Sequence, residues 1–175
     1  MKLKKEKKEK EREERGENPQ NASKEKWMKI FKEFEPKKEN IISILQCIQA
    51  EEKFNYIPEE AVHALADYLH IAPSKVYGVI SFYTMFSVIP RGKYIVRVCA
   101  SAPCHIMGST TVVEALKEIL GIELGETTED NLFTLESSSC LGLCDGAPAM
   151  MINDEVFRDL TGERVKEILE GKYHE

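Results

Sequence analysis

Long hydrophobic runs are missing from this chain. No uncharged apolar stretch approaches the roughly eighteen residues that a membrane-spanning helix needs, and the N-terminus lacks the apolar core of a secretory signal. Nucleotide-binding motifs are missing too, since no G-x-G-x-x-G follows a predicted strand and there is no P-loop. We therefore expect a cytoplasmic protein that does not insert directly into a membrane and does not itself bind a nucleotide cofactor.

Cysteine is scarce as well, at five residues in a chain of 175. Reducing compartments keep thiols free, so without an export signal a disulfide framework is disfavoured. Free cysteines in such a protein favour metal or redox chemistry instead. Their spacing is therefore the feature of the sequence to examine.

Charge is distributed unevenly along the chain. The net charge is −6, but residues 1–17 contain eight Lys or Arg and six Glu, so that segment carries +2 and the other 158 residues carry −8. A body this acidic excludes nucleic acid as an expected partner. Residues 2–15 are nearly all charged and have no apolar face, and the next eight contain Gly and Pro breakers. We interpret residues 1–23 as a charged flexible tail and linker.

Three amphipathic helices are predicted after this linker. Asn40 is placed to cap the first, Pro58 precedes the second, and the third begins near Ser74 and ends before a turn at residues 90–92. Their apolar faces are Ile41, Ile44, Leu45 and Ile48; Val62, Leu65, Ala66 and Leu69; and Val76, Val79, Ile80 and Tyr83. The pattern covers residues 38–87, and we assign residues 24–90 to a small helical bundle.

The pattern changes from residue 93 onward. Alternation over residues 94–98 predicts a strand that ends at the first cysteine. A helix after Ser109 and a second strand over residues 132–135 complete a βαβ unit, whose strands should be parallel. A hairpin at Asn153-Asp154 and a final helix from Thr161 follow. The fold class is therefore α/β with one mixed sheet, preceded by the helical bundle.

Four of the cysteines form two close pairs. Cys99 and Cys104 are spaced C-x4-C, Cys140 and Cys144 are spaced C-x3-C, and thirty-five residues separate the pairs. Each pair follows a predicted strand, and parallel strands bring their C-terminal ends to one edge of a sheet, so four thiolates are expected to meet there. Four cysteine sulfurs are the ligand set of a [2Fe-2S] cluster. Small residues around both pairs, such as Gly108, Gly142 and Gly146, allow backbone amides to approach the sulfurs.

Other interpretations of the cysteines stay open at this stage. Structural zinc sites also use four cysteines, although their pairs are usually the tighter C-x2-C. Two disulfides are a further alternative, which the compartment disfavours. We interpret Cys47, on the apolar side of the first helix, as a core residue and not a ligand. His105 follows Cys104 directly, and we interpret it as a polar neighbour rather than a substitute ligand.

A longer set of motifs resembles a known family, the thioredoxin-like [2Fe-2S] subunit of NADH-oxidising complexes, often called the 24-kilodalton subunit of respiratory complex I. The shared motifs are Tyr56-Ile57-Pro58, Val76-Tyr77-Gly78-Val79, Ser81 to Phe86, Pro90 to Tyr94, Cys99 to Cys104, Gly125 to Thr128, Phe133 to Glu136, Cys140 to Cys144, Ala147-Pro148 and Leu160-Thr161. The four paired cysteines fall on the family's four cluster ligands.

The resemblance implies a fold, a cofactor and partners. It implies that residues 91–175 form a thioredoxin-like [2Fe-2S] ferredoxin domain, in which Cys99, Cys104, Cys140 and Cys144 bind one cluster. It also implies an electron-transfer subunit without a complete active site, whose partner flavoprotein holds FMN and exchanges hydride with NAD(P)H. Further iron–sulfur or hydrogenase subunits are expected, as in NADH dehydrogenases, NAD(P)-linked or electron-bifurcating hydrogenases and formate dehydrogenases. Such a complex lies in the cytoplasm or on the cytoplasmic side of a membrane.

Two positions depart from the family pattern. Asn131 stands where glycine is common, and Ser137-Ser138-Ser139 precedes the third cysteine where an acidic side chain is common. Loss of a negative charge near the cluster favours the reduced form, so we expect a somewhat raised reduction potential.

Overall fold

The computed structural model describes residues 26–173. The chain divides into two compact units, Met1–Pro90 and Arg91–Glu175, each of which is described here by itself. The predicted tail and linker, residues 1–23, lie outside the described residues. Within the described part, no helix is long and apolar enough to cross a membrane.

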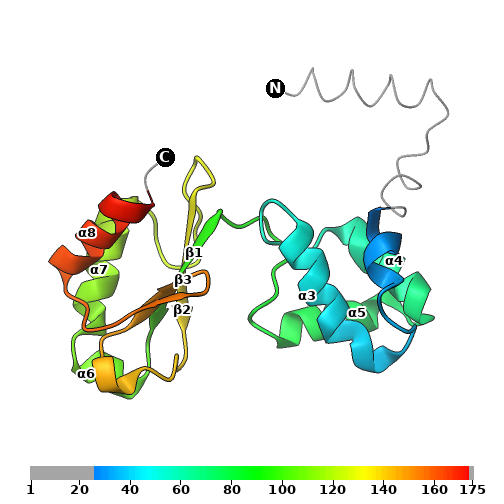
Figure 1. The fold of residues 1–175 in the computed structure, drawn as a ribbon, viewed down its shortest axis with the longest axis horizontal. Helices are drawn as coiled ribbons and strands as arrows, with labels where there is room; N and C mark the ends of the chain where they lie inside the picture. The colour runs from blue at the N-terminus through cyan, green and yellow to red at the C-terminus, as the bar shows by residue number, and fades with distance from the viewer. Residues whose placement is uncertain (1–25, 174–175) are drawn as a thin grey trace. The chain divides into compact units, whose positions relative to one another are not determined.

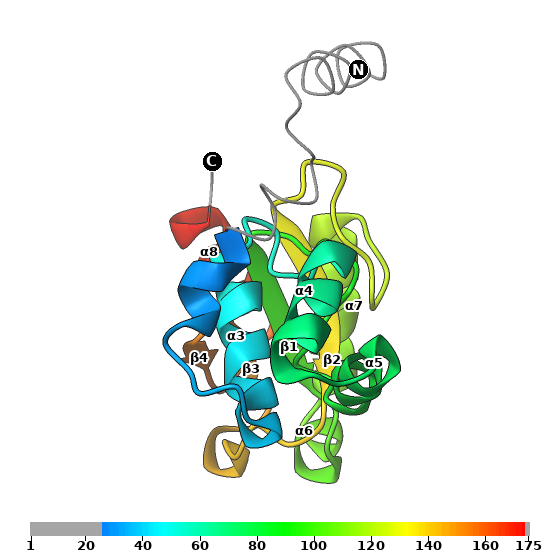
Figure 2. The ribbon, with the colours of Figure 1, turned by 90° about the vertical axis from the view of Figure 1, so that its right-hand side faces the viewer.

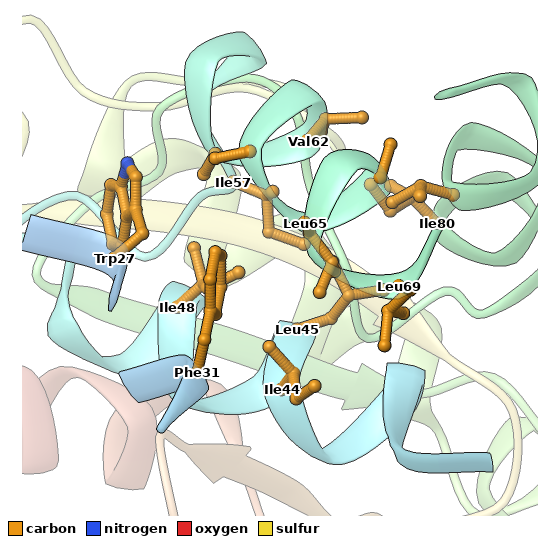
Figure 3. Packing of buried hydrophobic residues seen from close by; sticks show 14 of the residues in the cluster. Trp27, Phe31, Ile44, Leu45, Ile48, Ile57, Val62, Leu65, Leu69 and Ile80 are labelled. Carbon is orange, nitrogen blue, oxygen red and sulfur yellow. The ribbon is translucent and has the colours of Figure 1, made fainter. Parts of the chain in front are cut away.

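The first unit is helical (Figure 1). A helical stretch over residues 26–31 is followed by the short η1 (Lys38–Asn40), α3 (Ile41–Glu51), α4 (Glu59–Leu69) and α5 (Pro73–Phe82). Their apolar faces form one core, in which Phe31 lies beside Ile48 (Figure 3). All four residues predicted to form the apolar face of α4 are buried. The core also includes Trp27, which lies before the first of the three predicted helices.

Two details of this unit differ from prediction. Asn40 occupies the N-cap position of α3, but its side chain makes no capping bond; its Nδ2 instead donates to the carbonyl of Glu35 at 3.0 Å. Since Asn40 ends a 3-10 turn, its backbone already has helical dihedral angles, which suit a cap side chain poorly. Cys47 was predicted to be a core residue, and this was wrong: the side chain is only partly buried.

The second unit is an α/β fold, as predicted. Its elements are β1 (Tyr94–Cys99), α6 (Ala102–Ile106), α7 (Ser109–Leu120), β2 (Phe133–Ser138), η2 (Cys144–Gly146), β3 (Met150–Ile152), β4 (Glu155–Phe157) and α8 (Gly162–Lys172). The strand order is β2-β1-β3-β4; β1 and β2 are parallel, and β3 is antiparallel to both β1 and β4. The predicted βαβ unit, hairpin and mixed sheet are therefore confirmed.

Helices α7 and α8 pack side by side against one face of this sheet (Figure 1). Alternate residues of β1, such as Val96 and Val98, point into a core with Val112 and Leu116 of α7 and Val165 of α8. The opposite face of β1 carries the other set of alternate residues, and Cys99 is the last of them. Helix α8 begins directly after Thr161, where a final helix was predicted, and the Thr161 hydroxyl caps it by accepting a hydrogen bond from the Arg164 amide at 3.2 Å.

Candidate metal centre

Both cysteine pairs lie at one edge of the sheet. β1 ends at Cys99, and β2 ends at Ser138, two residues before Cys140. The two strands are parallel neighbours, with Cys99 in register with Ser138. Figures 1 and 2 show α6, which contains Cys104, and the η2 turn, which begins at Cys144, at the same end of this unit. The topology therefore brings the four predicted residues to one end of the sheet.

The first pair is buried in regular structure. Cys99 and Cys104 are each 1% exposed. Between them the chain begins α6, a helix of five residues with a proline in its first turn, whose single buried residue is Cys104. Burial, together with a hydrogen bond to Cys99, raises the pKa of the Cys104 thiol. The first pair is thus held close together by the fold itself.

The second pair lies in an exposed loop. Cys140 and Cys144 are both solvent-exposed, and their Sγ atoms are 3.9 Å apart. Gly142 between them has a φ of 75°, a conformation that favours glycine, and its N–H donates to the Sγ of Cys140 at 3.3 Å. The hydrogen bond and the charge of Cys140 raise the pKa of the Cys144 thiol, and the nearby charges of Cys99 and Asp145 add to this.

The two loops meet at Cys99. Its Sγ donates to the Ser139 carbonyl at 3.1 Å, and Ser139 lies directly before the second pair. Burial tends to raise the pKa of the Cys99 thiol, but hydrogen bonds from the backbone of Ser101 and Leu141 outweigh it, and the pKa is lowered. Ser101 belongs to the first loop and Leu141 to the second. A thiolate at Cys99 is therefore stabilised by amides from both loops.

The four thiols stand as two pairs. Within residues 26–173, no three or more His, Cys, Asp or Glu side chains are gathered tightly enough to hold a metal ion. The pairs are nevertheless close enough for the charge of Cys144 to raise the pKa of Cys104, and for the charge of Cys99 to raise the pKa of Cys144. Apolar residues from the second loop, Leu141, Leu143, Ala147 and Ala149, pack against the buried pair. His105 is exposed beside them.

Sequence patterns did not reveal how the charged residues around this edge pair with one another. Arg97, on the same face of β1 as Cys99, donates its Nε to Glu136 at 3.0 Å, and buried Arg91 donates to the same carboxylate at 3.1 Å. Arg97 is partly buried and paired, and Asp145 accepts a hydrogen bond from Arg158 at 2.6 Å. Such pairs depend on cross-strand register, which a single-sequence pattern does not specify.

Comparison with known proteins decides the family. The model of the family described as thioredoxin-like [2Fe-2S] ferredoxin matches residues 27–173. The chain belongs to this family. It is 38% identical over 135 residues to the HndA subunit of the NADP-reducing hydrogenase of Solidesulfovibrio fructosivorans, a match that covers 77% of this chain and 78% of the relative. It is 40% identical over 135 residues to an NADH-quinone oxidoreductase subunit of Aquifex aeolicus, a match that covers 77% and 83%.

A solved structure supports the fold. A chain of an NAD+-reducing [NiFe]-hydrogenase in the air-oxidised state superposes with a TM-score of 0.66 at 22% identity. The match covers 75% of this chain but only 22% of that much longer hydrogenase chain. At this identity the likeness concerns the fold alone.

The residues at the sheet edge fit the cluster that the family name implies. Membership of the [2Fe-2S] ferredoxin family implies a [2Fe-2S] cluster. The donor set is four thiols, two from each loop, which is the set that two iron atoms and two bridging sulfides need. Backbone hydrogen bonds already reach two of these sulfurs, at Cys99 and Cys140. Amides directed at sulfur are the usual surroundings of such clusters.

Proposed function

We propose that Cys99, Cys104, Cys140 and Cys144 hold one [2Fe-2S] cluster, and that the chain carries single electrons within a multi-subunit NAD(P)-linked oxidoreductase. The observation that carries the proposal is the meeting of the two cysteine loops at one edge of the sheet, where Cys99 ends β1 and its Sγ donates to the carbonyl of Ser139, directly before the second pair. The named relatives, subunits of an NADP-reducing hydrogenase and of an NADH-quinone oxidoreductase, support the wider setting.

The chain's own residues have a limited task in this function. When bound, the cluster supplies a one-electron redox centre. The four thiolates hold it, and amides such as that of Gly142 offset the negative charge on sulfur. Leu141 and Leu143 pack against the buried thiols and keep water from that side. No proton or hydride has to move on this chain.

The partner side of the proposal follows from the relatives' names and from the absence of a nucleotide-binding motif. We place FMN and the NAD(P) site on a separate flavoprotein subunit, with further iron–sulfur or hydrogenase subunits beyond it. The complex lies in the cytoplasm or on the cytoplasmic side of a membrane. Purification of the native complex, with mass spectrometry of the subunits, tests this; recovery without any flavoprotein would refute it.

The cluster itself is tested on the full chain purified without oxygen. We expect a red-brown protein with about two iron and two sulfide per chain, and an EPR signal after reduction with dithionite. Single Ser variants of the four proposed ligands should lose most of the iron. Cys47→Ser is the matched control, since Cys47 lies in the helical unit, and it should keep the full complement.

Zinc is the alternative occupant of a four-cysteine site. A colourless protein that contains about one zinc and no sulfide would contradict the redox function. In that case the chain would be a binding module that assembles partners without carrying electrons. Loss of iron in Cys47→Ser as well would contradict the ligand assignment.

A further inference from the structure

The segment that follows β4 is bonded to the segment that follows Cys144. The Asp159 amide donates to the Gly146 carbonyl at 2.8 Å, and the Leu160 amide donates to the Pro148 carbonyl at 3.1 Å. Within the loop, the Gly146 amide donates to the Leu143 carbonyl at 3.1 Å and closes the η2 turn. The second cysteine loop is therefore supported by the chain that leaves the sheet at the end of β4.

Arg158 adds a side chain to this support. Its aliphatic part covers Gly146, because a Cβ placed on Gly146 would lie only 2.8 Å from the Arg158 Cβ and 3.0 Å from its Cδ. Its guanidinium then reaches Asp145, where Nη1 donates to Oδ2 at 2.6 Å. One side chain thus contacts the two residues that directly follow Cys144.

The charge of Asp145 acts on the adjacent thiol. Asp145 directly follows Cys144 in the η2 turn, so its carboxylate stands beside a proposed ligand. An unpaired carboxylate at this position would disfavour additional negative charge at the sulfur, and reduction of a cluster adds one negative charge. The positive charge of Arg158 offsets the negative charge of the Asp145 carboxylate beside Cys144.

We propose that Arg158 is a positioning residue that holds the second cysteine loop and sets the charge beside its sulfurs. The inference rests on the proposed function, because the charge effect requires a cluster at these cysteines. The ion pair itself is exposed, with 43% of the Arg158 side chain and 72% of the Asp145 side chain accessible. Exposed ion pairs contribute little to stability. If Arg158 acted only on stability, its loss would leave the reduction potential unchanged.

The charge effect is tested by redox titration of the full chain with its cluster, followed by EPR. Arg158→Gln should shift the reduction potential downward, because Asp145 is left without its cation. Asp145→Asn should shift it upward, and the double variant should return close to the parent. Arg158→Lys keeps the charge and should restore most of the parent potential. Equal potentials in all variants, or shifts of the same sign in both single variants, would overturn the proposal.

Lys117→Gln is the matched control for this test. Lys117 forms a comparable ion pair with Glu123. Lys117 lies eight residues after the first residue of α7, which places it roughly 12 Å along the helix from the end nearest the cysteines. The Lys117→Gln substitution removes one positive charge from the same unit, as Arg158→Gln does, and the reduction potential should not change. A shift as large as that of Arg158→Gln would mean that net charge, and not position, is responsible, and would overturn the proposal.

The positioning effect is tested separately, on the cluster-free chain. Hydrogen exchange of the Asp159 and Leu160 amides should become about tenfold faster in Arg158→Ala, since the stem that covers Gly146 is removed. Unchanged exchange would overturn this part. If the parent chain bound no cluster at all, the proposed function would fail, while the exchange result would still decide whether Arg158 holds the loop.

Discussion

The two cysteine loops at the sheet edge are built in different ways. The first leaves β1 and enters α6 at once, so that Cys99 and Cys104 are buried as free thiols linked by a hydrogen bond. The second leaves β2, turns at a glycine with positive φ and remains exposed, with Cys140 and Cys144 in contact with solvent. One sheet edge therefore presents a buried pair beside an exposed pair.

The two pairs differ in how much conformational freedom their cysteines have. A buried pair held at the end of a strand and in a helix has few conformations available and loses little entropy when it binds a metal group. An exposed pair in a loop has more freedom to adjust its distance from the first. We infer that the first loop fixes the site and that the second closes onto the cluster. The exposed loop is also the side on which the cysteines contact solvent.

We expect the largest difference between the two cysteine pairs in the rates at which their thiols react with iodoacetamide in the cluster-free chain. Cys140 and Cys144 should react roughly a hundredfold faster than Cys104, because a buried thiol reacts only after a local opening that costs about 3 kcal/mol. The pKa is raised at both Cys104 and Cys144, so the expected difference between these two thiols comes from burial and not from the fraction of thiolate. Peptide mapping by mass spectrometry measures each rate.

Denatured protein provides the control for this experiment. In high urea the four thiols should react at similar rates, because the burial that distinguishes them is gone. Equal rates for Cys104 and Cys140 in the folded chain would show that the first loop is as open as the second. The division between a fixed and an adjustable pair would then be wrong.

A smaller effect is expected from closing the space beside the second loop. In Gly146→Ala the new Cβ would lie 2.8 Å from the Arg158 Cβ, so the loop or the segment after β4 must shift. We expect the free energy of unfolding to fall by about 1–3 kcal/mol, as for overpacked sites. Urea denaturation of the cluster-free chain measures this.

Gly171→Ala is the control for that substitution. Gly171 lies in α8, where a Cβ would meet nothing within 4 Å, and alanine is the better helix former. This variant should be as stable as the parent or slightly more stable. If Gly146→Ala were equally stable, the contact between Arg158 and the second loop would be too loose to position it.

The sequence predicted the framework of the site because that framework depends on local patterns. Alternation in β1, the helix after Ser109 and the second strand specify a βαβ unit, and parallel strands must end at one edge. The structure confirms this topology, and its register, which the sequence did not specify, pairs Cys99 with Ser138. The identity of the four ligands itself stays a prediction until metal is bound and measured.

The details at the edge were beyond prediction for physical reasons. Helix α6 has five residues, too few to show a period, so it was missed. The pairing of Arg158 with Asp145 depends on how the end of β4 meets the loop after Cys144, which no local pattern records. Asn131, noted as a departure from glycine, has a φ of 58°. Asparagine tolerates this left-handed conformation better than most residues, which explains the exchange.

The smallest expected effect concerns the loop between β2 and the exposed pair. Ser139 is exposed, and its carbonyl accepts the hydrogen bond from Cys99. We predicted a raised potential because serine stands where an acidic side chain is common. Ser139→Glu should therefore lower the reduction potential, since a carboxylate near the sulfurs disfavours the extra electron. Redox titration followed by EPR measures the shift.

Ser137→Glu is the matched control, because Ser137 is also exposed but lies within β2, two residues farther from Cys140. Charges in water are screened over about 10 Å, so the shift should be smaller than that of Ser139→Glu. If Ser139→Glu titrates at the parent potential, the prediction of a raised potential is wrong. If both variants shift equally, the potential responds to the charge of the whole unit, and the second loop is no more sensitive than the strand before it.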